Sequence, residues 1–141
     1  MNQIMPYSLW LGHAGDSNNF RQVFDAGIKA VVDLDVEDTP LQPPRELIYL
    51  RFPLLDGAEN EPELLGLTLR SLAVLLRMRM PTLLCCGVGL SRTPAVAAAV
   101  LSLVTNEEPE ACLRRVVEYH HSDVSPGLWH DLLGILPVIR G

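Results

Sequence analysis

Cationic side chains are scarce in this chain. Of its 141 residues only 11 are lysine or arginine, Lys29 is the sole lysine, and the formal net charge at pH 7 is −6. Proteins that bind nucleic acids usually present clustered lysine and arginine side chains to the phosphates, so we expect no nucleic-acid partner. A site for an anion must therefore rely on a few arginines and on backbone amides.

Cysteines and long apolar segments are also few. The three cysteines are Cys85, Cys86 and Cys112, an odd number that does not suit a disulfide framework and favours a reducing, cytoplasmic location. Adjacent Cα atoms lie only about 3.8 Å apart, so we expect no bridge between Cys85 and Cys86. No segment approaches the roughly 18 apolar residues of a membrane span, and we see no signal sequence, so we expect no membrane partner.

Apolar residues, in contrast, make up 48% of the chain and suffice for a buried core. Nothing repeats and no linker divides the sequence, so we predict one α/β domain over residues 1–141. Asn60 and Glu63 have the spacing of a capping box that would start a helix. The predicted strands are residues 9–11, 28–34, 47–52 and 82–85, and the predicted helices are residues 20–26, 61–79, 93–104, 109–120 and 127–136.

The most distinctive segment joins the predicted strand 82–85 to the predicted helix 93–104. It places a thiol, Cys86, at the end of a buried strand and a guanidinium, Arg92, at the start of a helix. Free N–H groups at a helix N-terminus and in a glycine-rich turn converge on one point and favour a phosphate there. The residues predicted to form this phosphate-binding loop are Gly87, Val88, Gly89, Leu90, Ser91 and Arg92.

The same arrangement favours reactive chemistry at Cys86. A thiol near a helix N-terminus and an arginine ionises more readily than a free thiol, and the thiolate is the nucleophilic form. Arg92 offers a planar fork that can bind two phosphate oxygens and stabilise the charge of a transition state. A cysteine taken alone is more often a buried core residue, but here the strand, turn and helix fall where the chemistry requires them.

The segment from Cys86 to Thr93 resembles the signature loop of the protein tyrosine phosphatase superfamily. Three further segments resemble its compact dual-specificity branch, namely residues 9–12 (LWLG), 49–56 (YLRFPLLD) and 124–127 (VSPG). The resemblance covers nearly the whole chain and implies a central, mostly parallel sheet flanked by helices. It also implies that Cys86 is the nucleophile, Arg92 binds phosphate, Thr93 eases departure of the thiolate, and Asp56 is the general acid.

One residue departs from the family pattern. Cys85 stands where the family usually has a histidine that helps to orient and acidify the nucleophile, so the thiolate would be less favoured than in relatives. Strand alternation turns neighbouring side chains to opposite faces of a sheet. We therefore interpret Cys85, like Cys112, as a buried apolar residue.

Asp56 is the candidate general acid on physical grounds too. Cleavage of a phosphate ester with a poor leaving group needs a proton donor, hydrolysis of the phosphocysteine then needs a base, and one carboxyl can do both. Asp56 follows a predicted strand, in a loop 30 residues before Cys86. A surface turn is the commoner role for such an aspartate when the sequence alone is considered. Glu59 and Glu61 are the nearby substitutes.

A competing motif lies in the acidic segment after the predicted strand 28–34. Asp33 and Asp35 resemble the Asp-x-Asp signature of the haloacid-dehalogenase phosphatases, which use magnesium and an aspartyl nucleophile. That family also needs a lysine later in the chain, and Lys29 precedes the motif. We interpret Asp33, Asp35, Glu37 and Asp38 as solvated turn residues.

The histidines His120, His121 and His130 invite a metal hypothesis. Adjacent histidines at a helix end have no spaced cysteine or carboxylate partner, so we interpret them as residues that complement the helix dipole. We expect no metal and no other cofactor.

These residues predict a phosphatase that hydrolyses phosphate monoesters through a phosphocysteine intermediate. The expected substrate is a phosphorylated protein or peptide, with phosphotyrosine first and phosphoserine or phosphothreonine if the cleft is shallow. The loop interior lacks basic residues, which argues against phosphoinositides. The alternatives are a phosphate-binding module that has lost turnover and a rhodanese-like sulfurtransferase. The sequence does not define the oligomeric state, and we expect a monomer.

Overall fold

The computed structural model describes residues 1–141. Five strands form one sheet: β1 (Asn2–Gln3), β2 (Leu9–His13), β3 (Ala30–Asp33), β4 (Ile48–Arg51) and β5 (Thr82–Cys86). Their order across the sheet is β1-β2-β5-β3-β4, and all neighbours are parallel except β1 and β2. The prediction of a central, mostly parallel sheet is confirmed.

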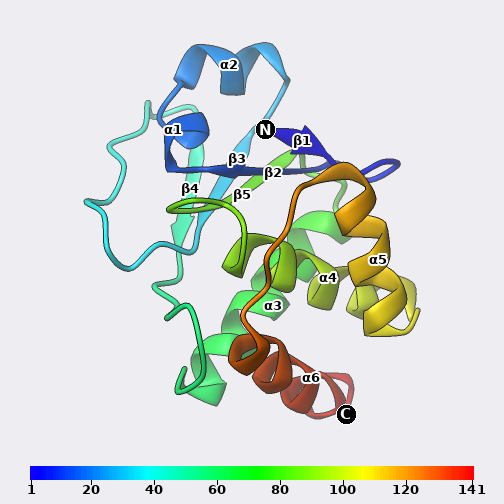
Figure 1. Cartoon of the computed structure of the whole chain (residues 1–141). Coiled ribbons are helices and arrows are strands. Elements are labelled where there is room, and N and C mark those ends of the chain that lie inside the picture. The colour runs from blue at the N-terminus through cyan, green and yellow to red at the C-terminus, as the bar shows by residue number, and fades with distance from the viewer.

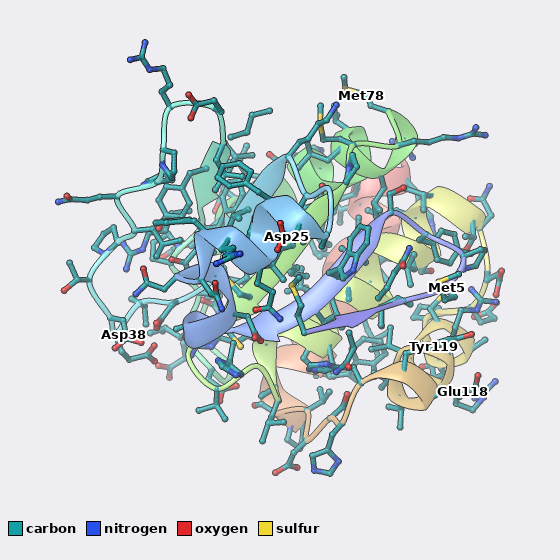
Figure 2. The ribbon with its side chains drawn as sticks, turned by 90° about the horizontal axis from the view of Figure 1, so that it is seen from above. Met5, Asp25, Asp38, Met78, Glu118 and Tyr119 are labelled. Atoms are coloured by element: carbon teal, nitrogen blue, oxygen red, sulfur yellow. The ribbon has the colours of Figure 1, made fainter.

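Helices cover both faces of this sheet. They are α1 (Ala14–Ser17), α2 (Phe20–Asp25), α3 (Pro62–Arg77), α4 (Arg92–Thr105), α5 (Pro109–Tyr119) and α6 (Pro126–Arg140). Helices α1 and α2 lie on one side, and α3 to α6 lie on the other (Figure 1). Figure 2 looks onto the first side, where Asp25 at the end of α2 lies over the sheet. No helix combines the length and the apolar character needed to cross a bilayer.

Strand β5 divides two cores because its side chains alternate. Leu84 and Cys86 face the main core, which includes α4, whereas Leu83 and Cys85 face a smaller core beneath α2. Every residue of α4 from Arg92 to Leu103 is buried, and its alanines let the helix pack closely on its neighbours. The prediction that Cys85 and Cys86 point to opposite faces is confirmed.

The predicted capping box is wrong. Helix α3 begins at Pro62, one residue later than predicted, its N-cap is Glu61, and no side chain caps it. Asn60 is buried and instead accepts a hydrogen bond from the Leu55 N–H at 2.7 Å and donates to the Leu55 and Gly57 carbonyls at 2.9 and 3.3 Å. An asparagine can serve loop backbone as readily as helix backbone, and here it closes the loop 55–60.

Substitutions on helix α3 can test which of its faces packs on the main core. Leu69 is fully buried, whereas Leu67 on the same helix is 54% exposed. We predict that Leu69→Ala lowers the free energy of unfolding by about 2–5 kcal/mol because it removes buried methyl groups and leaves a cavity. The matched Leu67→Ala should change it by less than about 0.5 kcal/mol. Urea denaturation measures both, and equal losses would contradict this packing.

Candidate active site

The candidate site lies where the parallel strands end. The carboxyl ends of β2, β3, β4 and β5 meet at one edge of the sheet, and β5 carries Cys86 to this edge. In register, His13 of β2 is opposite Cys86, and Asp33 of β3 is opposite Cys85. Ligands of open α/β sheets bind at this edge, beside the strand where the connections turn to opposite faces. Here that strand is β5, flanked by α1 on one face and α4 on the other (Figure 1).

A cavity of ≈ 230 Å³ opens at this position. It brings together the predicted thiol and guanidinium groups, both from the segment 86–92, and the predicted carboxyl group, from the loop 55–60. Its lining residues are Asp56, Cys86, Val88, Gly89, Leu90, Ser91, Arg92 and Asp123. Larger cavities of up to ≈ 540 Å³ lie elsewhere, but no cysteine lines any of them. The chemistry predicted from the sequence therefore converges on the smaller cavity.

Gly89 is required by the shape of the loop. Its φ angle is +81°, a conformation that other residues rarely adopt. A Cβ atom there would also lie 2.6 Å from the Gly12 carbonyl oxygen of β2. The loop can therefore rest directly on the end of β2 only if this residue is glycine.

Arg92 is anchored through one of its three guanidinium nitrogens. Nη1 donates to both carboxylate oxygens of Glu37, at 3.0 and 3.2 Å, and to the Leu54 carbonyl at 3.0 Å. Nε has no partner, and Nη2 lies 3.9 Å from an Asp35 oxygen. Burial alone would lower the pKa of Arg92, but its hydrogen bonds to Glu37 raise it, so the group stays cationic. Nε and Nη2 together form a fork for two oxygens of an oxyanion.

The prediction that the whole acidic segment is solvated is wrong. Asp33 and Asp35 are buried, at 7% and 2% exposure. Asp33 accepts hydrogen bonds from the Asp35 N–H at 2.9 Å and the Tyr49 hydroxyl at 2.8 Å, and Asp35 accepts one from the Glu37 N–H at 2.9 Å. Burial and the bond to Asp33 raise the pKa of Tyr49 to about 12. These successive turns fold the segment back so that Glu37 reaches Arg92.

Two carboxyl groups of this segment, Asp35 and Asp38, have shifted pKa values. Burial alone would raise the pKa of Asp35, but hydrogen bonds from Glu37 and Asp38 bring it well below its usual range. Asp38 is exposed, and its pKa is raised by its hydrogen bond to Asp35. In Figure 2 it marks the outer side of this loop, opposite Met5 and Tyr119. The Glu37 carboxylate lies 3.0 Å from Nη1 of Arg92, and the Asp35 carboxylate lies 3.9 Å from Nη2.

Asp56 is tied to the loop by a serine. The Ser91 hydroxyl donates to Asp56 Oδ1 at 2.5 Å and accepts from the Ser125 N–H at 2.9 Å. The sequence placed Ser91 in the loop but gave no sign of this link between the loop 55–60 and the segment before α6. Glu59 and Glu61, the substitute acids, do not line the cavity. Asp123 does line it, and no sequence pattern pointed to this residue.

Solved structures share this architecture over its full length. Human DUSP28 has 24% sequence identity and a TM-score of 0.86, with 99% of this chain and 98% of that chain covered. A mouse putative dual specificity phosphatase, complexed with zinc tungstate, has 22% identity and a TM-score of 0.85, covering 99% and 87%. The human tyrosine phosphatase-like serine/threonine/tyrosine-interacting protein has 18% identity and a TM-score of 0.84, covering 100% and 98%.

The chain has the fold of the small dual-specificity phosphatases. At the level of sequence, no protein-family model and no curated protein matches it.

Within the dual-specificity phosphatase fold, Thr93 and Cys85 lie on either side of the segment 86–92, in different surroundings. The Thr93 hydroxyl, in the first turn of α4, is fully buried and has no hydrogen-bond partner. A buried hydroxyl without a partner costs free energy, which is typical of a group kept for function. The Cys85 thiol lies 3.7 Å from the Val32 carbonyl, and burial raises its pKa, as it does for Cys112. Cys85 and Cys112 are neutral, buried side chains, as predicted.

The interpretation of His120 as a residue that complements the helix dipole is wrong. Its side chain is buried, with Nε2 at 2.6 Å from the Gly89 carbonyl and Nδ1 at 3.0 Å from Nδ2 of Asn2. Its neighbour His121 is exposed. The backbone turns from helical to extended at His120, which directs its ring into the protein.

The fork of Arg92 can be tested by oxyanion binding. We predict that Arg92→Lys weakens the binding of tungstate by about 10- to 100-fold, because a charged hydrogen bond contributes about 1.5–3 kcal/mol and an ammonium group cannot replace the fork. The exposed Arg114 offers a matched control, and Arg114→Lys should bind tungstate like the unmodified chain. Isothermal titration calorimetry measures both affinities. Equal affinities would contradict the assignment of the fork.

Proposed function

We propose that this chain is a cysteine-dependent phosphatase that hydrolyses phosphate monoesters through a phosphocysteine intermediate. The observation that carries the proposal is the convergence of Cys86, Arg92 and Asp56 on one cavity, with Nε and Nη2 of Arg92 free of hydrogen bonds. The dual-specificity phosphatase fold supports it.

In the first step the Cys86 thiolate attacks phosphorus. The bond from phosphorus to the ester oxygen breaks, its electron pair stays with that oxygen, and Asp56 supplies the proton that the departing oxygen needs. Arg92 and the loop amides bind the non-bridging oxygens, whose charge is redistributed in the transition state. Ser91 holds the Asp56 carboxyl at the edge of the same cavity.

In the second step water attacks the phosphocysteine. Asp56, now ionised, removes a proton from the water, and the bond between sulfur and phosphorus breaks to release inorganic phosphate and the thiolate. The unpartnered Thr93 hydroxyl supports a role in this step, because it can donate a hydrogen bond to the departing thiolate. No cofactor takes part in either step.

Phosphotyrosine in a protein or peptide is the proposed substrate. Arg92 is the only cationic side chain among the lining residues, and Glu37 and Asp35 lie beside it, so the cavity suits a single phosphate group. A polyanionic inositol headgroup would face Asp56 and Asp123 without further cations to balance its charge.

A phosphate-binding module without turnover is the second candidate. Cys85 motivates this candidate, because it replaces the histidine usual in the family. The human tyrosine phosphatase-like serine/threonine/tyrosine-interacting protein, whose name describes an interaction, also shares the fold. The fold gives no support to the sulfurtransferase alternative.

Turnover separates these candidates. We predict steady hydrolysis of an aryl phosphate that persists in excess EDTA, is blocked by vanadate, and is lost in Cys86→Ser, because the nucleophile is a thiolate. Cys112→Ala, which alters a buried cysteine outside the cavity, should retain activity. Phosphate release in a colorimetric assay measures this. Oxyanion binding without release would establish the binding module instead.

The general acid can be tested through the leaving group. We predict that Asp56→Asn lowers kcat on phenyl phosphate by about 10² to 10³, because a phenoxide needs a proton. The loss should be clearly smaller on a fluorinated coumarin phosphate, whose leaving group is more acidic, when phosphoenzyme formation limits the rate. If hydrolysis of the phosphoenzyme limits instead, the variant should show a burst of phenol followed by slow turnover.

Matched controls for this experiment are Glu59→Gln and Glu61→Gln, which change carboxyls outside the cavity. They should keep near-normal kcat on both substrates. Equal losses of Asp56→Asn on both esters without a burst would remove Asp56 from the role of acid.

A further inference from the structure

The phosphate-binding loop is held from outside through its carbonyl groups. Three of them accept hydrogen bonds from groups beyond the loop. The Gly87 carbonyl accepts from the Ala14 N–H of α1 at 3.3 Å, and the Leu90 carbonyl accepts from the Asp123 N–H at 2.7 Å. The third, the Gly89 carbonyl, lies 2.6 Å from His120 Nε2.

These outward bonds determine where the loop amides point. In a planar trans peptide the C=O group and the following N–H group point in opposite directions. A carbonyl held toward the outside therefore turns the next amide toward the cavity. The amides so directed belong to Val88, Leu90 and Ser91, and all three residues line the cavity.

His120 differs from the other two donors because it is a side chain. A carbonyl oxygen only accepts, so the hydrogen lies on Nε2, and Nδ1 is left to accept from the Asn2 amide of β1. Asn2 thus selects the tautomer that can donate to the loop. The recipient, Gly89, is a glycine with a φ angle of +81°, and glycine has more conformational freedom than any other residue, so this bond restrains a peptide that no side chain of its own restrains.

We propose that His120 is a positioning residue for oxyanion binding, which fixes the Gly89 carbonyl and thereby directs the Leu90 N–H at the phosphate. This inference rests on the proposed function for its biological role. The role of His120 in oxyanion binding can be measured without turnover.

The test compares two amides at position 120. In His120→Gln the side-chain amide nitrogen reaches the place of Nε2 and can donate to Gly89, whereas in His120→Asn it ends near the place of Nδ1 and cannot. Both variants lose the packing of the ring, so a purely structural role predicts equal effects. His121→Ala, at the exposed neighbour, is the control.

We expect His120→Asn to bind tungstate about 10-fold more weakly, since one loop hydrogen bond contributes about 1–1.5 kcal/mol. Its kcat/KM on an aryl phosphate should fall by at least as much, because the same amide faces the transition state. His120→Gln should stay within about threefold of the unmodified chain on both measures, at a melting temperature similar to that of His120→Asn. His121→Ala should match the unmodified chain.

Normal tungstate binding by folded His120→Asn, or equal losses in both variants, would overturn the proposal. If His120→Asn does not fold, Asn2→Ala provides the test. We expect Asn2→Ala to bind tungstate about threefold more weakly, because the donating tautomer of His120 is no longer selected. Unchanged tungstate binding by Asn2→Ala would overturn the proposal. If the unmodified chain binds tungstate but hydrolyses no ester, the proposed function fails while the role of His120 is still tested by calorimetry.

Discussion

Much of this structure depends on the burial of one cation. Arg92 begins a helix whose next eleven residues are also buried, and Arg92 itself is only 6% exposed. A buried charge is costly unless it is paired and hydrogen-bonded. The protein meets this requirement with the Leu54 carbonyl and with Glu37, which the turns at Asp33 and Asp35 deliver to the site.

Those contacts explain why only one edge of the Arg92 guanidinium faces the cavity. One edge of the guanidinium is committed to the protein, and the other edge is available to a ligand. The loop follows the same rule, because its carbonyls are bonded to the surrounding elements while its amides are left for an anion. In both cases the protein uses the outward half of a polar group to orient the inward half, which is the preorganisation that electrostatic catalysis requires.

Local sequence predicted most of the fold and the centre of the site. Strand β5, the glycine-rich turn and α4 were identified because apolar periodicity and turn residues act over a few positions. The contacts of Glu37 with Arg92 and of His120 with Gly89 were missed, since the partners are 55 and 31 residues apart. Asn60 was misassigned for another reason: its short-range pattern fits either a helix cap or a closed loop, and only tertiary packing decides between them.

The charge of the cavity lining has a consequence for inhibitor design. Asp56 and Asp123 border the cavity beside a single arginine, whose charge is already balanced by Glu37. A ligand that is anionic throughout is therefore attracted by Arg92 and repelled by Asp56 and Asp123. The matching scaffold is a zwitterion, with a compact oxyanion or phosphonate for the loop and an amine placed toward the two aspartates.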